Sequence, residues 1–116
     1  MIGNRYNKGK SEWGLVDWEV IEDMVKVLEF GKQKYDAWNW AKGLYWVKII
    51  ESLLIHTFAI LRGENIDSDS KLPHYAHIMC NAMFLGRMMK SRPDLDDRFL
   101  FKIKKLKKLK KKKKKK

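Results

Sequence analysis

Cysteine is almost absent from the sequence, since Cys80 is the only one among 116 residues. No internal disulfide bond can form, which is typical of proteins in a reducing compartment, and we expect a cytoplasmic location. Residues 1–10 are polar and lack the apolar segment of a signal peptide. A membrane span needs roughly 18 uninterrupted apolar residues. The longest apolar stretch, residues 49–61, is interrupted by Glu51, Ser52, His56 and Thr57, so no membrane span is predicted.

Strand-like alternation of polar and apolar residues is also missing, and we find no internal repeat. Apolar residues instead recur every three or four positions in three segments, near residues 17–35, 45–62 and 73–90. Asp17 is a suitable helix N-cap, Gly63 a suitable stop, and Pro73 fits a first helical turn. The sequence therefore predicts an all-α fold: a compact bundle of three main helices, followed by a C-terminal basic helix and tail.

The net charge of +12 is distributed very unevenly. Residues 1–90 hold 12 Lys and Arg against 11 Asp and Glu, whereas residues 91–116 hold 14 against 3. We therefore predict a nearly neutral helical domain over residues 1–90 and a lysine-rich amphipathic helix with a disordered tail over residues 91–116. The tail is either a nonspecific docking segment for nucleic acid or merely a solubilising or accidental extension.

Three polar side chains share one face of the third predicted helix. At 100° per residue, His74, His77 and Asn81 fall within roughly 60° of one another. Imidazole nitrogens bind transition metals and a carboxamide supplies a neutral oxygen, so these residues are candidate metal ligands. His56, on the nearly apolar second helix, is either a hydrogen-bonded core residue or a fourth member of the same site. The acidic segment around Asp67 precedes the third helix and offers a carboxylate.

The other charged and aromatic residues allow two interpretations. Glu19, Glu22, Asp23 and Glu29 are either a carboxylate row for magnesium or a solvated helix face, and we favour the second interpretation for Glu19 and Asp23. Lysines near the N-terminus and after the first helix are either phosphate contacts or ordinary surface residues. Two tryptophans in the turn after residue 36 need a pocket or a partner. A P-loop, a His-Asp dipeptide and a serine nucleophile elbow are absent, which excludes three common hydrolase types.

Several motifs together resemble a phage and prophage family, the N-terminal domain of dATP/dGTP diphosphohydrolases. The resemblance covers about residues 4–86. It is carried by an Arg-Tyr-Asn-Lys-Gly-Lys segment at 5–10, Leu-Glu-Phe-Gly with Lys-Tyr at 28–35, and Asn-Trp at 39–40. It continues with Glu-Ser-Leu-Leu and His at 51–56, Gly-Glu with Ile-Asp at 63–67, Leu-Pro-His at 72–74 and a histidine-asparagine motif at 77–85. Similarity to the wider MazG-like all-helical pyrophosphohydrolases is weaker, because His77 and Asn81 replace acids. Family members usually have a glycine where this chain has Lys71.

The resemblance implies metal-dependent hydrolysis of purine deoxynucleoside triphosphates to monophosphate and pyrophosphate. The cofactor would be Mg²⁺ or Mn²⁺, or another transition metal, and the location the cytoplasm of a bacterial host. The expected site consists of catalytic, metal-binding and substrate-binding residues. The expected catalytic residues are Glu29, Glu51 and Asp67. The expected metal ligands are His56, His74, His77 and Asn81. The expected substrate-binding residues are Lys8, Lys10, Lys34, Trp38, Asn39 and Trp40.

Two alternatives to the enzyme stay open. One is a non-catalytic nucleotide- or nucleic-acid-binding accessory protein that docks through the basic tail. The other is a helical oligomerisation module, which the apolar second helix would suit. Formation of a homo-oligomer is expected in every case, since a chain this short buries only a modest part of its apolar surface.

Overall fold

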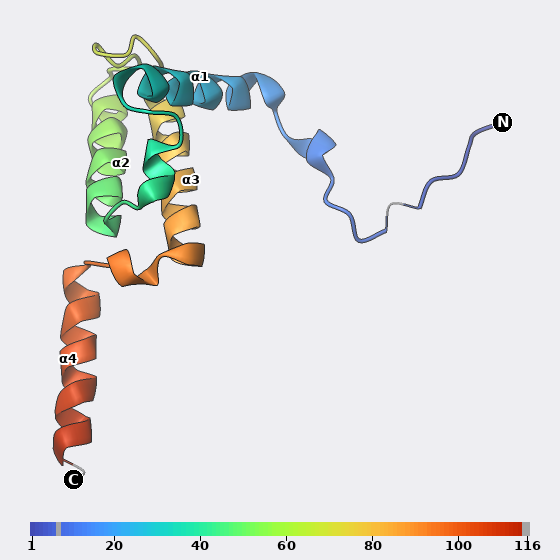
Figure 1. The fold of residues 1–116 in the computed structure, drawn as a ribbon. Coiled ribbons are helices and arrows are strands. Elements are labelled where there is room, and N and C mark those ends of the chain that lie inside the picture. The colour runs from blue at the N-terminus through green and yellow to red at the C-terminus, as the bar shows by residue number, and fades with distance from the viewer. Residues whose placement is uncertain (7, 115–116) are drawn as a thin grey trace.

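The structure is a computed structural model that describes residues 1–6 and 8–114. Four α-helices follow one another along the chain: α1 (Trp18–Lys34), α2 (Trp46–Leu61), α3 (His74–Ser91) and α4 (Phe99–Lys114), as Figure 1 shows. Single 3-10 turns lie before and between them: η1 (Trp13–Leu15), η2 (Asn39–Lys42) and η3 (Pro93–Leu95). No strand occurs in the described part of the chain, which confirms the predicted all-α fold.

The helix ends follow local signals in the sequence. The side chain of Asp17 accepts hydrogen bonds from the backbone N–H groups of Glu19 and Val20, so it caps α1 as expected. α2 ends at Leu61, and Gly63 adopts the left-handed conformation with φ of 92°. Pro73 is the N-cap of α3 rather than part of its first turn, because an isolated antiparallel bridge to Ile66 holds it in the preceding loop.

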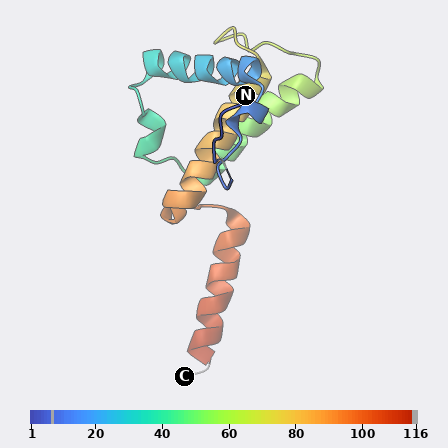
Figure 2. The ribbon, with the colours of Figure 1, turned by 90° about the vertical axis from the view of Figure 1, so that its right-hand side faces the viewer.

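The helices α1, α2 and α3 form the packed body. α2 and α3 run side by side in opposite directions, and α1 lies across the end of this pair at which the loop 62–73 also sits (Figures 1 and 2). Two small buried clusters hold the body together. One contains Val27, Ala76 and Cys80, and the other contains Trp46, Ile49 and Met88. Phe84 packs against both clusters and so connects the two halves of the body.

Both ends of the described chain extend away from this body (Figures 1 and 2). The N-terminal segment before α1 is almost wholly exposed. At the other end α4 is helical to Lys114, so the expectation that the lysine run from residue 110 is disordered is wrong for residues 110–114. Lysine has a high helix propensity, and extending an existing helix costs far less than starting one. Lys115 and Lys116 lie outside the described residues. No described helix is both long and apolar enough to cross a membrane.

Candidate functional site

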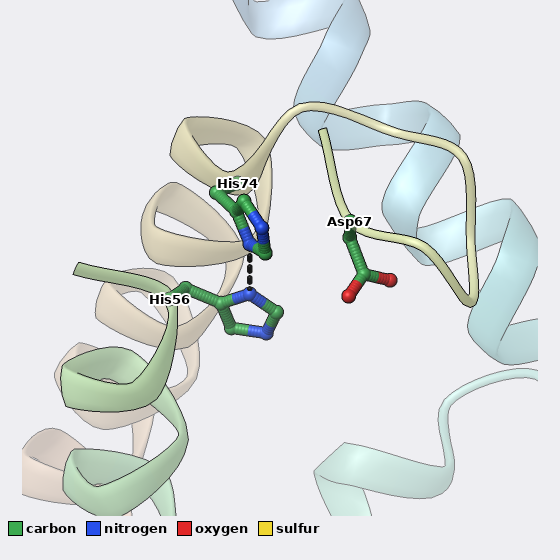
Figure 3. A group of neighbouring side chains, drawn as sticks. All are labelled: His56, Asp67 and His74. Atoms are coloured by element: carbon green, nitrogen blue, oxygen red, sulfur yellow. Dashed lines mark hydrogen bonds between the residues drawn. The ribbon is translucent and has the colours of Figure 1, made fainter. Parts of the chain in front are cut away.

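All three histidines of the chain meet where α2, α3 and the loop 62–73 converge. The Nδ1 atoms of His56 and His74 are 2.8 Å apart, as the dashed line in Figure 3 shows. The ring of His77 stacks on that of His56, with centroids 4.4 Å apart and planes at 7°. Of the two alternatives left open for His56, the structure shows the one in which it meets His74 and His77. This arrangement arises because α2 and α3 are antiparallel neighbours, so their facing residues meet.

The loop 62–73 places Asp67 beside the histidines. The backbone N–H of Asp67 donates to the Leu72 carbonyl (2.9 Å), and the N–H of Lys71 donates to the Asp67 carbonyl (2.8 Å). These bonds close the loop on itself and fix its shape. In Figure 3, Asp67 lies beside the rings of His56 and His74. A carboxylate oxygen of Asp67 and one ring nitrogen each of His56 and His74 all lie within 4.8 Å of one another.

Ser70 connects Asp67 to His77. Its backbone N–H and its hydroxyl both donate to Asp67 Oδ2, each at 2.8 Å. Ser70 Oγ also lies 2.7 Å from His77 Nε2. Because the single hydroxyl hydrogen of Ser70 goes to Asp67, Nε2 of His77 is the donor in the second bond. A neutral His77 therefore keeps a lone pair on Nδ1, where it can accept a proton.

His74 contains a polar atom without a hydrogen-bonding partner. The residue is only 4% exposed, and its Nε2 makes no hydrogen bond to any described residue. Glu64 Oε1 is 3.7 Å away, which is close enough for an ion pair and too far for a hydrogen bond. Buried polar atoms are normally satisfied, so this nitrogen is a candidate ligand atom. Two imidazoles and a carboxylate suit a transition metal better than Mg²⁺, which prefers carboxylates and water.

Burial and neighbouring groups lower the pKa values of His56, His77 and Asp67. Burial lowers the pKa of His56, and the neighbouring His77 and His74 lower it further. Burial also lowers the pKa of His77, against the opposing effect of Asp67. For Asp67, burial acts to raise the pKa, but the two hydrogen bonds from Ser70 and the nearby histidines outweigh it and lower the pKa. Neutral imidazoles beside an ionised carboxylate are the protonation states that a cation requires.

A groove of about 910 Å³ begins at this cluster and follows α1 and η2. Asp67 and His77 line one part of it, while His56 and His74 are not among the lining residues. Another part is lined by aromatic rings: Trp40 stacks on Phe84 with centroids 5.1 Å apart and lies 5.6 Å from Trp38. The volume is in the range of ordinary ligand pockets.

Eight of the thirteen predicted site residues line this groove. Those from α1 and η2 are Glu29, Lys34, Trp38, Asn39 and Trp40. Asn81 also lines the groove, but its amide nitrogen donates to Ser52 Oγ (3.1 Å) and to the His77 carbonyl (3.0 Å), so it braces α3 against α2.

Besides His56 and His74, three predicted site residues do not line the groove. Lys8 and Lys10 belong to the exposed N-terminal segment and do not line the groove. Glu51 lines a second groove between α2 and α4 and pairs with Lys48 at 3.7 Å. Its separation from His56 follows from their spacing, since five residues turn a helix by about 140°.

Sequence reasoning missed Ser70, Ser52 and Phe84 as members of the site, while Glu64 belongs to the acidic segment from which it expected a carboxylate. For Ser70 a signal existed in the sequence. The side chain of an aspartate in a turn commonly accepts hydrogen bonds from residues two or three positions later, and Ser70 follows Asp67 by three. Phe84 carried no such signal, since its role depends on η2 folding back onto α3.

Fold and site together define a small all-helical protein that presents a histidine–aspartate cluster to an aromatic groove. The chain belongs to the family described as "dATP/dGTP diphosphohydrolase, N-terminal", whose family model matches residues 2–98. A protein of Salmonella phage PMBT28 named "dATP/dGTP diphosphohydrolase" is 31% identical over 98 residues, which cover 84% of this chain and 33% of the relative. The chain thus spans about a third of the relative's length. No solved structure gives a significant match.

Proposed function

We propose that the chain binds a purine deoxynucleoside triphosphate in the groove and hydrolyses it to monophosphate and pyrophosphate with the help of a divalent metal. The phage relative carries the name of this activity. That relative is about three times as long, so activity of this shorter chain is an inference from its own site. The observation that carries it is one groove joining an aromatic stack to a histidine–aspartate cluster.

The lining of the groove suits a nucleotide. Trp38 is 70% exposed beside the more buried Trp40, so its ring has a free face on which a purine can stack. Lys32 and Lys34 line the same groove and supply positive charge for phosphates. Lys34 Nζ is 4.0 Å from Asp69 Oδ2. Both groups are exposed, so this weak ion pair leaves the lysine available.

The metal would be held by His56, His74 and Asp67, and Mn²⁺ or another transition metal fits these donors best. A bound divalent cation would polarise a phosphate oxygen and lower the pKa of a water molecule. In the reaction, a water oxygen forms a bond to the α-phosphorus, and the bond between that phosphorus and the bridging oxygen breaks. The electron pair of the broken bond leaves with pyrophosphate.

The proton of the attacking water must pass to a base in the groove. Asp67 accepts two hydrogen bonds from Ser70, which reduces its basicity. Glu29 lines the groove without a described partner in an ion pair or hydrogen bond, and His77 keeps a free Nδ1 lone pair. We assign the proton transfer to one of these two residues, with Glu29 first because its carboxylate makes no bond that would have to break.

Hydrolysis of each deoxynucleoside triphosphate in the presence of Mn²⁺ or Mg²⁺ tests the proposal. The expected result is release of monophosphate and pyrophosphate from dATP and dGTP, with the pyrimidine nucleotides turned over more slowly. Asp67→Asn should abolish turnover because it removes a proposed metal ligand, whereas Thr57→Ala, beside His56 on α2, should not. Absence of pyrophosphate with all four nucleotides and both metals would contradict the enzymatic function.

We also infer that copies of the chain associate through α2. Its outer face exposes Ile55, Phe58 and Leu61 by 63%, 50% and 83%. Apolar side chains gathered on one helix face commonly mark an interface between proteins. Light scattering of the purified chain tests this, and Phe58→Glu should shift an oligomer toward monomer. A monomer at every concentration would contradict it.

A further inference from the structure

We propose that α4 is an amphipathic anchor that lies on the surface of an anionic lipid bilayer. Apolar side chains follow one side of this helix, at positions 99, 103, 106 and 109. At 100° per residue, these four positions fall within about 120° of the helix circumference. Exposed lysines at 104, 105, 107, 108, 111 and 112 lie outside this arc, and Lys110 alone of the exposed lysines described in α4 lies within it.

The apolar side of α4 is left uncovered by the body of the protein. Phe99 is 73% exposed, Leu106 58% and Leu109 50%. Only the first part of the helix borders α2, where Phe99, Leu100 and Lys104 line the groove between α2 and α4. Beyond it the helix projects freely from the body (Figures 1 and 2). The exposed leucines would therefore be stabilised by any apolar phase that reached them.

The charge of α4 favours an acidic partner from outside the chain. Residues 91–116 have a net charge of +11, while residues 1–90 have a net charge of +1 and so carry no net negative charge that would attract the helix. Pairing of two α4 helices would bring like charges together. An uncharged apolar partner would leave the lysines without counter-charges. The surface of an anionic bilayer offers both negative headgroups and an apolar interior within reach of one helix.

A nucleic acid would contact the lysines of α4 and would not cover its apolar side chains. Lysines alone neutralise phosphates, and their spacing around a helix matters little for such contacts. The leucines at 106 and 109 would stay exposed to water on a nucleic acid duplex. A helix lying in the interface of a bilayer buries that stripe while its lysines contact headgroups. No described helix is able to span a membrane, so the contact we propose is at the surface.

Family membership separates this anchor from the proposed hydrolysis. The family match ends at residue 98, directly before α4 begins at Phe99. The site residues all precede this boundary. Binding to lipid therefore does not depend on the proposed activity, and the two can fail independently.

Co-sedimentation of the full chain with lipid vesicles tests the anchor. The chain should pellet with vesicles of phosphatidylcholine mixed with phosphatidylglycerol and stay in solution with phosphatidylcholine alone. The double variant L106S/L109S keeps every charge. It should bind the anionic vesicles at least about tenfold more weakly, because two leucine side chains no longer enter the apolar phase.

Two controls make the result specific. The double variant L106F/L109F keeps the apolar stripe and should bind vesicles like the parent chain. Retention on duplex DNA should be equal for the parent and L106S/L109S, since it depends on charge alone. The proposal is overturned if the parent chain does not bind anionic vesicles, if L106S/L109S binds them equally well, or if DNA is bound and vesicles are not.

Discussion

The Nδ1 atoms of His56 and His74 lie 2.8 Å apart although the two residues come from different helices. Only one of the two nitrogens can carry the hydrogen of this contact, so the other offers a lone pair. If that hydrogen moved to Nε2 of its own ring, both Nδ1 atoms would offer lone pairs to a shared cation. The pair thus combines a helix–helix contact with a candidate metal site, and each role can be tested.

Replacement of His56 by glutamine should weaken the binding of Mn²⁺ by at least about tenfold, since even indirect supports of a metal site commonly contribute this much. Titration calorimetry or the electron paramagnetic resonance signal of free Mn²⁺ measures the change. Thr57→Ala is the matched control, because the Thr57 hydroxyl only donates to the Leu53 carbonyl of its own helix. Equal affinity in the parent and His56→Gln would contradict the assignment of His56 as a ligand.

Ser70→Ala should lower the free energy of unfolding by about 1–3 kcal/mol, because Asp67 and His77 each lose a partner in a partly buried place. Urea denaturation measures the loss. Ser91→Ala removes a serine hydroxyl that only donates to the Arg87 carbonyl of its own helix at an exposed position, and it should cost much less. Similar effects of the two substitutions would show that Ser70 has no special role in the loop.

Local signals predicted the helices well, while the site depended on contacts between distant segments. Asp17 caps α1 and Gly63 follows the end of α2 because such residues act on their own backbone. Spacing along α3 predicted a shared face for His74 and His77. Sequence alone could not place His56 opposite them, since that contact requires the antiparallel pairing of α2 with α3.

Trp38→Ala should raise the KM for a purine nucleotide about tenfold with little change in stability, since stacking of a base on an aromatic ring contributes about 1–3 kcal/mol. The large exposure of Trp38 explains why the fold would tolerate its loss. Steady-state kinetics with dATP measures the effect. Trp13→Ala is the control, because Trp13 is equally exposed, at 69%, and lies outside the groove. Equal KM values for the two variants would show that Trp38 does not contact the nucleotide.

Stability of the metal-free protein should fall as the pH is lowered below about 6.5, the ordinary pKa of histidine. The pKa values of His56 and His77 are lowered in the folded chain, chiefly by burial, so the unfolded chain takes up protons first and is favoured. The loss continues until the pH passes the folded-state values. Asp67 adds a further loss below its ordinary pKa of 3.8, since its pKa is lowered as well.

Urea denaturation in the presence of a chelator, from pH about 8 to about 5, measures this dependence. The double variant H56Q/H77Q should flatten the curve, because glutamine does not titrate. A parent chain whose stability is constant across this range, or rises toward acid, would show that the two imidazoles are not held neutral.

Lys71→Gly should stabilise the protein by about 1 kcal/mol. Lys71 has a φ of 62°, in the left-handed region where a side chain crowds its own backbone and glycine does not. The loop imposes this angle through two hydrogen bonds. The Lys71 N–H donates to the Asp67 carbonyl, and the Asp67 N–H donates to the Leu72 carbonyl. The greater freedom of glycine in the unfolded chain offsets part of the gain. Urea denaturation compares it with Lys71→Ala, which removes the charge and keeps the strain and should therefore change little. If glycine and alanine have the same effect, the gain does not come from the backbone of the loop that carries Asp67.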